Sequence, residues 1–188
     1  MDITSGSSSV FKPADYAKVP DSKVSTNILF NVIHIENIAV SRLSQLEDWR
    51  EYEDPSKIAV DRINQSRRII REISLEDDQS SMIYQPIETY KLLLRDFSNN
   101  YCYAYEKEPL RFLRESQSQT RTLTPLKIQL GGRLRVLSGA KVINGVIYLD
   151  NGHCQYLGLQ NQDQDLIDNL NTGLVLRNIE ILRAELDS

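Results

Sequence analysis

Short apolar runs bounded by turn residues recur along this chain, a pattern that is typical of β-strands and hairpins. The first clear strand signal covers residues 28–38, where apolar side chains occupy both faces, so a buried strand is predicted. His34 lies within this strand, and His153 is the only other histidine of the sequence. Two isolated histidines supply neither a metal ligand set nor a base for a nucleophile, so His34 is interpreted as structural.

Glycines at positions 132, 139, 145 and 158 divide a second apolar block into strand-length pieces. An Asn-Gly pair at positions 151 and 152 adds a further turn signal. Short β-branched and aliphatic runs that end at such residues are typical of strands and hairpins. Together with the first strand they predict a small β-barrel, a fold that more often binds an extended strand or a partner protein than carries out catalysis.

Residues 89–97 and 101–108 form a predicted β-hairpin, joined by the polar residues 98–100. The second strand of this hairpin places three tyrosines on one face, namely Tyr101, Tyr103 and Tyr105. Two interpretations stay open. The rings either form a platform on which the bases of a single-stranded nucleic acid stack, or they fill a half-exposed sheet surface, where tyrosine is a favoured residue.

A long polar segment, residues 41–86, separates the first strand from this hairpin. Within it a helix is predicted from Pro55, which suits a first helical turn, to about Ile73. Acidic residues dominate positions 47–54, and basic residues dominate positions 57–71. A connection of this length inside a compact domain is usually functional or disordered, so activity is expected in this insertion.

The two ends of the chain are predicted to differ from the barrel. Residues 1–25 are rich in serine and are expected to form a mostly disordered leader. Residues 163–188 are expected to be helical, with two apolar faces. The first face holds Leu166, Ile167 and Leu170, and the second holds Val175, Ile179, Leu182 and Leu186.

Composition narrows the classes of function. The 188 residues are 40% hydrophobic and 26% charged, which suits a globular domain. The net charge of −4 argues against autonomous, charge-driven nucleic-acid binding, because contacts to phosphates depend on lysine and arginine. No apolar run reaches the roughly 18 residues of a membrane span, and the N-terminus lacks signal-peptide features. Cys102 and Cys154 are interpreted as free thiols of a reducing compartment.

The sequence contains no recognised catalytic or cofactor pattern. It has no GxSxG motif, and the pair Gly131 and Gly132 lacks the context of a phosphate-binding loop. The acidic run Glu76, Asp77 and Asp78 is interpreted as hydrated rather than as a magnesium site. We therefore expect no cofactor, no bound metal and no enzymatic activity.

Four segments, taken in order, carry a resemblance to a known family. They are LFNVIHIENIAVSRLSQLE at 29–47, DPSKIAVDRI at 54–63, YKLLLRDF at 90–97 and the glycine-framed block at 132–158. They resemble the N-terminal OB-fold part of the RecQ-mediated genome instability protein family, in its budding-yeast form. The resemblance implies a mainly β fold with helices. It places a single five-stranded OB barrel at residues 26–162, with the insertion 41–86 after the first strand, and a C-terminal helical segment at residues 163–188.

The resemblance also implies that the chain is a non-catalytic subunit. In the family, this barrel accompanies a RecQ helicase and binds a type IA topoisomerase, topoisomerase III, in the nucleus. The insertion favours the open DNA gate during decatenation and the dissolution of recombination intermediates such as double Holliday junctions. DNA is then contacted mainly through the complex, with no membrane partner. By position in the insertion, the expected partner-binding residues are Trp49, Tyr52, Arg62, Arg67, Arg68 and Arg71.

A second function belongs to a different class. The chain would be a stand-alone OB-fold protein that binds single-stranded DNA in replication or at telomeres. Its stacking platform would then be the strand that carries Tyr101, Tyr103 and Tyr105.

Overall fold

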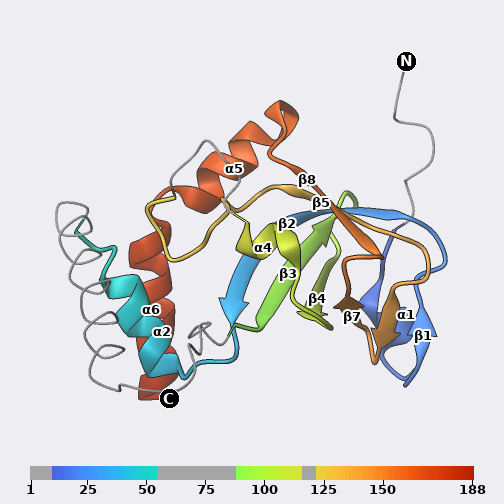
Figure 1. The fold of residues 1–188 in the computed structure, drawn as a ribbon, viewed down its shortest axis with the longest axis horizontal. Coiled ribbons are helices and arrows are strands. Elements are labelled where there is room, and N and C mark those ends of the chain that lie inside the picture. Colours follow the sequence, from blue (N-terminus) through green and yellow to red (C-terminus); the bar gives the residue numbers. More distant parts are fainter. Residues whose placement is uncertain (1–9, 55–87, 116–121) are drawn as a thin grey trace, which may run out of the picture. The chain divides into compact units, whose positions relative to one another are not determined.

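The computed structural model describes residues 10–54, 88–115 and 122–188, and Figure 1 labels most of their helices and strands. The chain divides into two compact units. The barrel unit comprises Met1–Ala39, Thr89–Thr122 and Leu126–Thr172, and the helical unit comprises Val40–Glu88, Leu123–Pro125 and Gly173–Ser188. Two of the boundaries, at residues 39–40 and 88–89, lie close to the ends of the predicted insertion 41–86.

Eight strands of the described chain form one curled sheet in the barrel unit. Their order across the sheet is β1-β6-β7-β4-β3-β2-β5-β8, and the pair β4 and β7 is parallel. The strands are β1 (Ser22–Lys23), β2 (Ile28–Asn37), β3 (Tyr90–Asp96), β4 (Tyr101–Glu106), β5 (Arg133–Val136), β6 (Lys141–Ile143), β7 (Val146–Leu149) and β8 (Cys154–Gly158). The predicted first strand and the predicted hairpin correspond to β2 and to β3 with β4.

The strand count differs from the predicted five because two bent stretches each break into two strands. β5 and β6 follow one another within residues 133–143, and β7 and β8 follow one another within residues 146–158. The two stretches pair with each other, β6 with β7 and β5 with β8. Between these ladders, the N–H of Leu137 donates to the carbonyl of His153 at 2.8 Å, so the two breaks face one another. The short β1, paired with β6, is an additional edge strand.

Followed from strand to strand, the pairings lead from β2 around the sheet and back to β2. β2 pairs with β3, β3 pairs with β4, and β4 pairs with β7 on the second bent stretch. That stretch pairs with the first bent stretch, which returns to β2 through β5. The core lies on the inner face, where Phe30, Leu92, Leu94 and Leu134 are fully buried. Burying one such side chain contributes about 1.5–3 kcal/mol to stability.

Two tight turns of the barrel unit contain residues with left-handed backbone. Asn99, in the turn between β3 and β4, has φ 63°. Asn144 and Gly145, between β6 and β7, have φ 50° and 84°. Two consecutive left-handed residues are typical of a type I′ turn, whose twist matches that of the flanking strands. Gly145 was predicted as a turn residue from the sequence, whereas the part that Asn144 plays in this turn was not predicted.

The prediction of a disordered leader is wrong for residues 10–25, which pack against the barrel. Residues 1–9 lie outside the described part of the chain. Phe11 is 1% exposed, stacks on Tyr16 with ring centroids 5.1 Å apart and meets Phe30 edge-on at 6.2 Å. β1 follows and pairs with β6. A few isolated apolar residues anchor this segment to the core, and such residues produce no periodic signal in the sequence.

The C-terminal helical segment is split between the units. The barrel unit has α1 (Pro13–Tyr16), α4 (Arg111–Arg114), the 3-10 turn η1 (Asn161–Asp163) and α5 (Gln164–Asn171), whereas the helical unit has α2 (Arg42–Arg50) and α6 (Leu174–Asp187). Gly173, with φ 66°, separates α5 from α6. The Asn171 side chain holds α5 to the barrel by accepting from the N–H of Leu130 at 3.0 Å and donating to its carbonyl at 2.9 Å.

The helical unit consists, in its described part, mainly of α2 and α6, which contact each other (Figure 1). Its buried residues are Gln45, Leu46 and Trp49 on α2 and Leu174, Asn178, Ile179 and Leu182 on α6. The predicted stripe on α6 is correct at Ile179 and Leu182 but wrong at Leu186, which is 44% exposed. The helix predicted from Pro55 to Ile73 lies outside the described residues.

Candidate functional site

The base of the insertion is fixed by one backbone hydrogen bond and by the side chain of Asn37, which join its two ends. The N–H of Ile38 donates to the carbonyl of Thr89 at 2.8 Å. The side-chain oxygen of Asn37 accepts from the N–H of Ala39 at 3.1 Å and from that of Thr89 at 3.2 Å. The chain therefore leaves β2 and enters β3 at one clamped point, which we call the insertion clamp.

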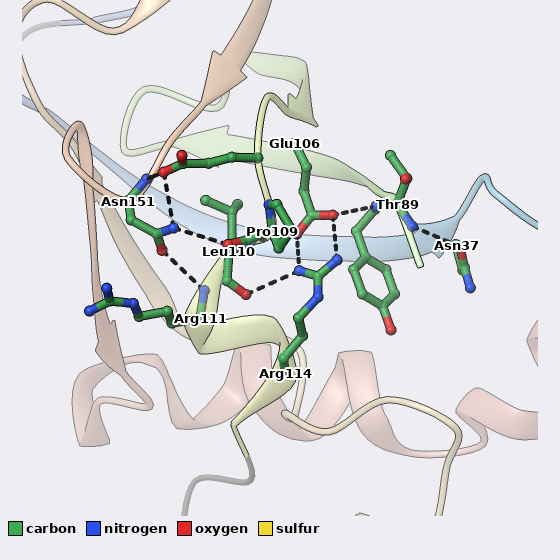
Figure 2. A network of polar contacts seen from close by, with 10 residues as sticks. Asn37, Thr89, Glu106, Pro109, Leu110, Arg111, Arg114 and Asn151 are labelled. Atoms are coloured by element: carbon green, nitrogen blue, oxygen red, sulfur yellow. Dashed lines mark hydrogen bonds and ion pairs between the residues drawn. The ribbon is translucent and has the colours of Figure 1, made fainter. Parts of the chain in front are cut away.

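A buried carboxylate supports the returning end of the insertion, as Figure 2 shows. Glu106, at the end of β4, accepts from the N–H of Tyr90 at 2.9 Å and from that of Leu110 at 3.0 Å. Arg114 of α4 forms a two-point ion pair with it, in which NH2 lies 2.9 Å from Oε2 and NH1 bonds to Oε1. The same guanidinium covers the ring of Tyr90, with 5.3 Å between its carbon and the ring centroid.

A second set of polar contacts in Figure 2 ties α4 to the turn between β7 and β8. Asn151 accepts from the N–H of Arg111 at 3.1 Å and donates from its side chain to Glu108 at 3.0 Å and to the carbonyl of Pro109 at 2.9 Å. The first set ties β3 to β4 and α4, and the second ties α4 to the turn after β7. Sequence patterns did not reveal Asn37, Glu106 or Arg114, because their partners are distant in sequence or belong to the backbone.

The predicted insertion residues fall into three groups. Trp49 lies on α2 and is only 7% exposed, so its ring already packs within the protein. Tyr52 follows α2 and is half-buried. The predicted arginines Arg62, Arg67, Arg68 and Arg71 lie outside the described residues.

Helix α2 was not predicted as a separate element, although its start carries a recognisable cap. The hydroxyl of Ser41 accepts from the N–H of Ser44 at 3.1 Å, which satisfies one of the orphan donors of the first turn. Leu46 and Trp49 are buried on this helix, three positions apart. The sequence signal was a serine cap followed by a few apolar residues, which the surrounding charged residues obscured.

The tyrosine strand β4 has the alternation that was predicted. Tyr101 is 51% exposed and Tyr103 is 48% exposed, whereas the intervening Cys102 is buried. The ammonium of Lys91 on β3 lies 4.2 Å from the ring centroid of Tyr103. Tyr105 is half-buried and stacks on Tyr148 of β7, with ring centroids 5.9 Å apart. Two of the three tyrosines are therefore accessible, while the third packs against its neighbour.

Cys102 and Cys154 are candidates for thiol chemistry, but their surroundings disfavour the reactive thiolate form. Burial raises the pKa of the Cys102 thiol to about 12 and that of the Cys154 thiol to about 11, so both thiols are protonated at neutral pH. No group of three or more potential metal ligands occurs among residues 10–54, 88–115 and 122–188. In the same residues, no helix is long and apolar enough to cross a membrane.

Residues 11–166 match the family described as RMI1, N-terminal OB-fold domain. The chain belongs to this family. It is also similar to RecQ-mediated genome instability protein 1 of Saccharomyces cerevisiae, with 24% identity over 180 residues that cover 80% of this chain and 69% of that protein.

The family assignment confirms the predicted resemblance and the predicted OB fold. The family match begins at residue 11, the position of the buried Phe11, and ends at residue 166 within α5. The ordered N-terminal segment is thus part of the region that the family shares, whereas α6 lies beyond the match.

Proposed function

We propose that this protein is a non-catalytic subunit of a RecQ helicase and topoisomerase III complex, which works in the nucleus. The observation that carries the proposal is the family match over residues 11–166. The name of the yeast relative connects that protein with RecQ-mediated genome stability. In this proposal the chain binds the type IA topoisomerase and stimulates decatenation and the dissolution of recombination intermediates, including double Holliday junctions.

The insertion clamp supports a mechanism in which the barrel presents the insertion to the partner. Asn37 and Thr89 hold the two ends of the insertion together, and Glu106 braces the strand that follows. A ligand shifts a conformational equilibrium only by binding one state better than the other. The insertion would do so by binding the open gate of the topoisomerase, and the clamp would reduce the ordering cost of that contact.

The roles of the predicted insertion residues differ within this proposal. Tyr52 and the arginines Arg62, Arg67, Arg68 and Arg71 would contact the partner or its DNA. Trp49, which is 7% exposed, would instead position the start of the insertion by packing in the helical unit. Contact with DNA would then arise mainly within the complex, in agreement with the net charge of −4.

Co-purification of the full chain with the type IA topoisomerase of the same cell tests this proposal. Stable association, together with faster decatenation than the topoisomerase shows alone, is the expected result. Association that is absent at micromolar concentrations of both proteins would contradict it. A hydrolase or nuclease turnover of the purified chain that is lost in the double variant Asp77→Asn and Asp78→Asn would contradict its non-catalytic part.

The exposed tyrosines favour a second candidate function, direct binding of single-stranded DNA. Tyr101 and Tyr103 are about half exposed on one strand face, and Lys91 lies over the ring of Tyr103. Stacking of a base on an aromatic ring contributes about 1–3 kcal/mol. This function requires salt-sensitive binding of an oligonucleotide by the chain alone, with a loss of roughly tenfold or more in Tyr103→Ala. A Tyr16→Ala variant is the control, because Tyr16 stacks on Phe11 and is not part of β4.

A further inference from the structure

Three arginines lie on the outer face of neighbouring strands of the sheet, away from the insertion clamp. Arg95 of β3 pairs with Asn31 of β2, which in turn pairs with Arg133 of β5. Arg135 lies two positions beyond Arg133 on the same face of β5. We call Arg95, Arg133 and Arg135 the arginine cluster. It extends across β3, β2 and β5, which are neighbouring strands of the sheet.

The arginine cluster carries more positive charge than the described residues around it neutralise. Arg133 forms a two-point ion pair with Asp163, at 2.7 Å from Nε and 3.0 Å from NH2. Asn31 also donates to Asp163, at 3.1 Å. Asp163 is therefore hydrogen-bonded to Arg133 and Asn31, and its pKa is lowered by these two hydrogen bonds and by the charges of Arg133 and Arg95. The cluster thus sets one carboxylate against three guanidinium groups. Within the part of the chain that the structure describes, Arg135 has the neutral Gln155 as its hydrogen-bond partner, whose side-chain oxygen accepts from Nη1 at 3.2 Å.

Two donors of the cluster are buried without a partner among the described residues. They are the Nε atoms of Arg95 and Arg135. A guanidinium that has lost part of its hydration without gaining hydrogen bonds lowers stability. An external anion that binds the outward nitrogens of the same groups would offset this cost with charge-assisted hydrogen bonds. The cluster thus has the charge and the preorganisation of an anion-binding surface.

Aromatic side chains border the cluster. Tyr101 is directly opposite Arg95 in the β3–β4 ladder and is 51% exposed. Phe97, in the turn after β3, is 55% exposed, and the guanidinium carbon of Arg133 lies 5.0 Å from its ring centroid. Arginine and aromatic residues are the residue types that are enriched at protein interfaces. Their combination with uncompensated charge fits a partner segment that carries both carboxylates and an apolar side chain.

We propose that the arginine cluster, with Phe97 and Tyr101, binds an acidic segment of a partner protein. A peptide can place carboxylates at Arg95 and Arg135 and neutral residues beside Asp163. A nucleic-acid strand carries a phosphate at every nucleotide and would bring negative charge against Asp163, which lies next to Arg133 in the same cluster. The observations therefore favour the acidic peptide. The proposal does not depend on the insertion or on topoisomerase binding.

The test uses the full chain and a fluorescent peptide that contains several glutamates and phenylalanines. The control peptide is identical except that glutamine replaces every glutamate. Fluorescence anisotropy is expected to show binding of the acidic peptide only, with an affinity that falls as salt rises. Arg95→Gln and Arg135→Gln are each expected to weaken binding about tenfold, which corresponds to one charge-assisted hydrogen bond of roughly 1.4 kcal/mol.

Lys23→Gln is the matched control, since it removes one positive charge from an exposed position on β1. It is expected to bind the peptide like the unmodified chain, and equal melting temperatures of all variants show that folding is unchanged. Equal loss in Lys23→Gln and Arg95→Gln would overturn the proposal, as would failure of the acidic peptide to bind. A single-stranded oligonucleotide that binds through Arg95 and Arg135 while the peptide does not would also overturn it.

Discussion

The carboxylate of Asp96 joins segments that are far apart in the sequence. It is 2% exposed and accepts from the N–H groups of Phe11 at 3.1 Å, Ser98 at 2.8 Å and Asn100 at 2.8 Å. The side chain of Asn100 donates to it at 2.9 Å. One residue thus fixes both the N-terminal segment and the turn between β3 and β4. The turn displays Phe97, so the order of this surface depends on a buried acid.

Replacement of Asp96 by asparagine is expected to destabilise the barrel unit by about 2–3 kcal/mol at pH 7, because an amide nitrogen would face backbone donors. Although burial alone would raise the pKa of Asp96, its hydrogen bonds lower it below the usual value. The folded-state pKa is therefore below the unfolded value of roughly 3.9, and the contribution of Asp96 is present above that pH. It is lost as the pH falls through the folded-state pKa.

Urea unfolding of the unmodified chain and of Asp96→Asn at several pH values measures this effect. The stability difference between them is expected to be constant above about pH 5 and to shrink below about pH 4. Asp15→Asn serves as a control, because Asp15 is an exposed acid on α1. A difference that stays constant down to pH 2.5, or a variant as stable as the unmodified chain at pH 7, would contradict the assignment.

At the scale of elements, the turn between β6 and β7 depends on Gly145. This residue has φ 84°, and a Cβ atom there would lie 2.8 Å from the carbonyl oxygen of Pro13. Gly145→Ala therefore combines backbone strain with a clash and is expected to cost at least about 1–3 kcal/mol. Chemical denaturation followed by circular dichroism measures it.

Gly158 provides the comparison for this prediction. Its φ is 77°, but nothing lies within 4 Å of the Cβ position. Gly158→Ala is expected to show only the backbone strain, of about 1 kcal/mol. If Gly145→Ala were no more destabilising than Gly158→Ala, the contact between the N-terminal segment and this turn would be refuted.

Helix α2 offers a second test at this scale, since Trp49 is the only tryptophan of the chain. Trp49→Ala is expected to destabilise the helical unit by about 3–5 kcal/mol, because it removes a large buried side chain. Trp49→Phe is expected to retain most of that stability. Thermal unfolding followed by far-ultraviolet circular dichroism measures both variants, and an Ala variant of unchanged stability would show that the ring contributes little to packing.

The sequence predicted the elements whose signal is local and periodic. The alternation of β3 and β4, including the outward Tyr101 and Tyr103, follows directly from side-chain period. Other features depend on contacts that no local pattern contains. The hydrogen bond between Phe11 and Asp96 joins residues 85 positions apart, and the Arg133–Asp163 pair joins residues 30 positions apart. For this reason the ordered N-terminus and the arginine cluster were not predicted, while the barrel was.

At the scale of the whole molecule, the distribution of charge and the connectivity agree with the proposed role of an acidic chain in a DNA-processing complex. The net charge of −4 is combined with a local arginine cluster and with the basic segment 57–71 of the insertion. The OB fold is shown by the family match, while the insertion begins and ends at the clamp formed by Asn37 and Thr89. A rigid barrel that presents one long segment is suited to bind and stabilise one state of a partner.

The most direct measurement replaces residues 55–86 with a flexible glycine and serine linker of equal length. This change keeps α2 and the insertion clamp and removes the predicted contacts Arg62, Arg67, Arg68 and Arg71. Decatenation by the type IA topoisomerase is measured with the unmodified chain, with the linker variant and with a Lys23→Gln control. If the insertion acts on the topoisomerase, the linker variant is expected to lose most of the stimulation of decatenation, while the Lys23→Gln control retains it. Full stimulation by the linker variant would contradict the central claim that the insertion acts on the topoisomerase.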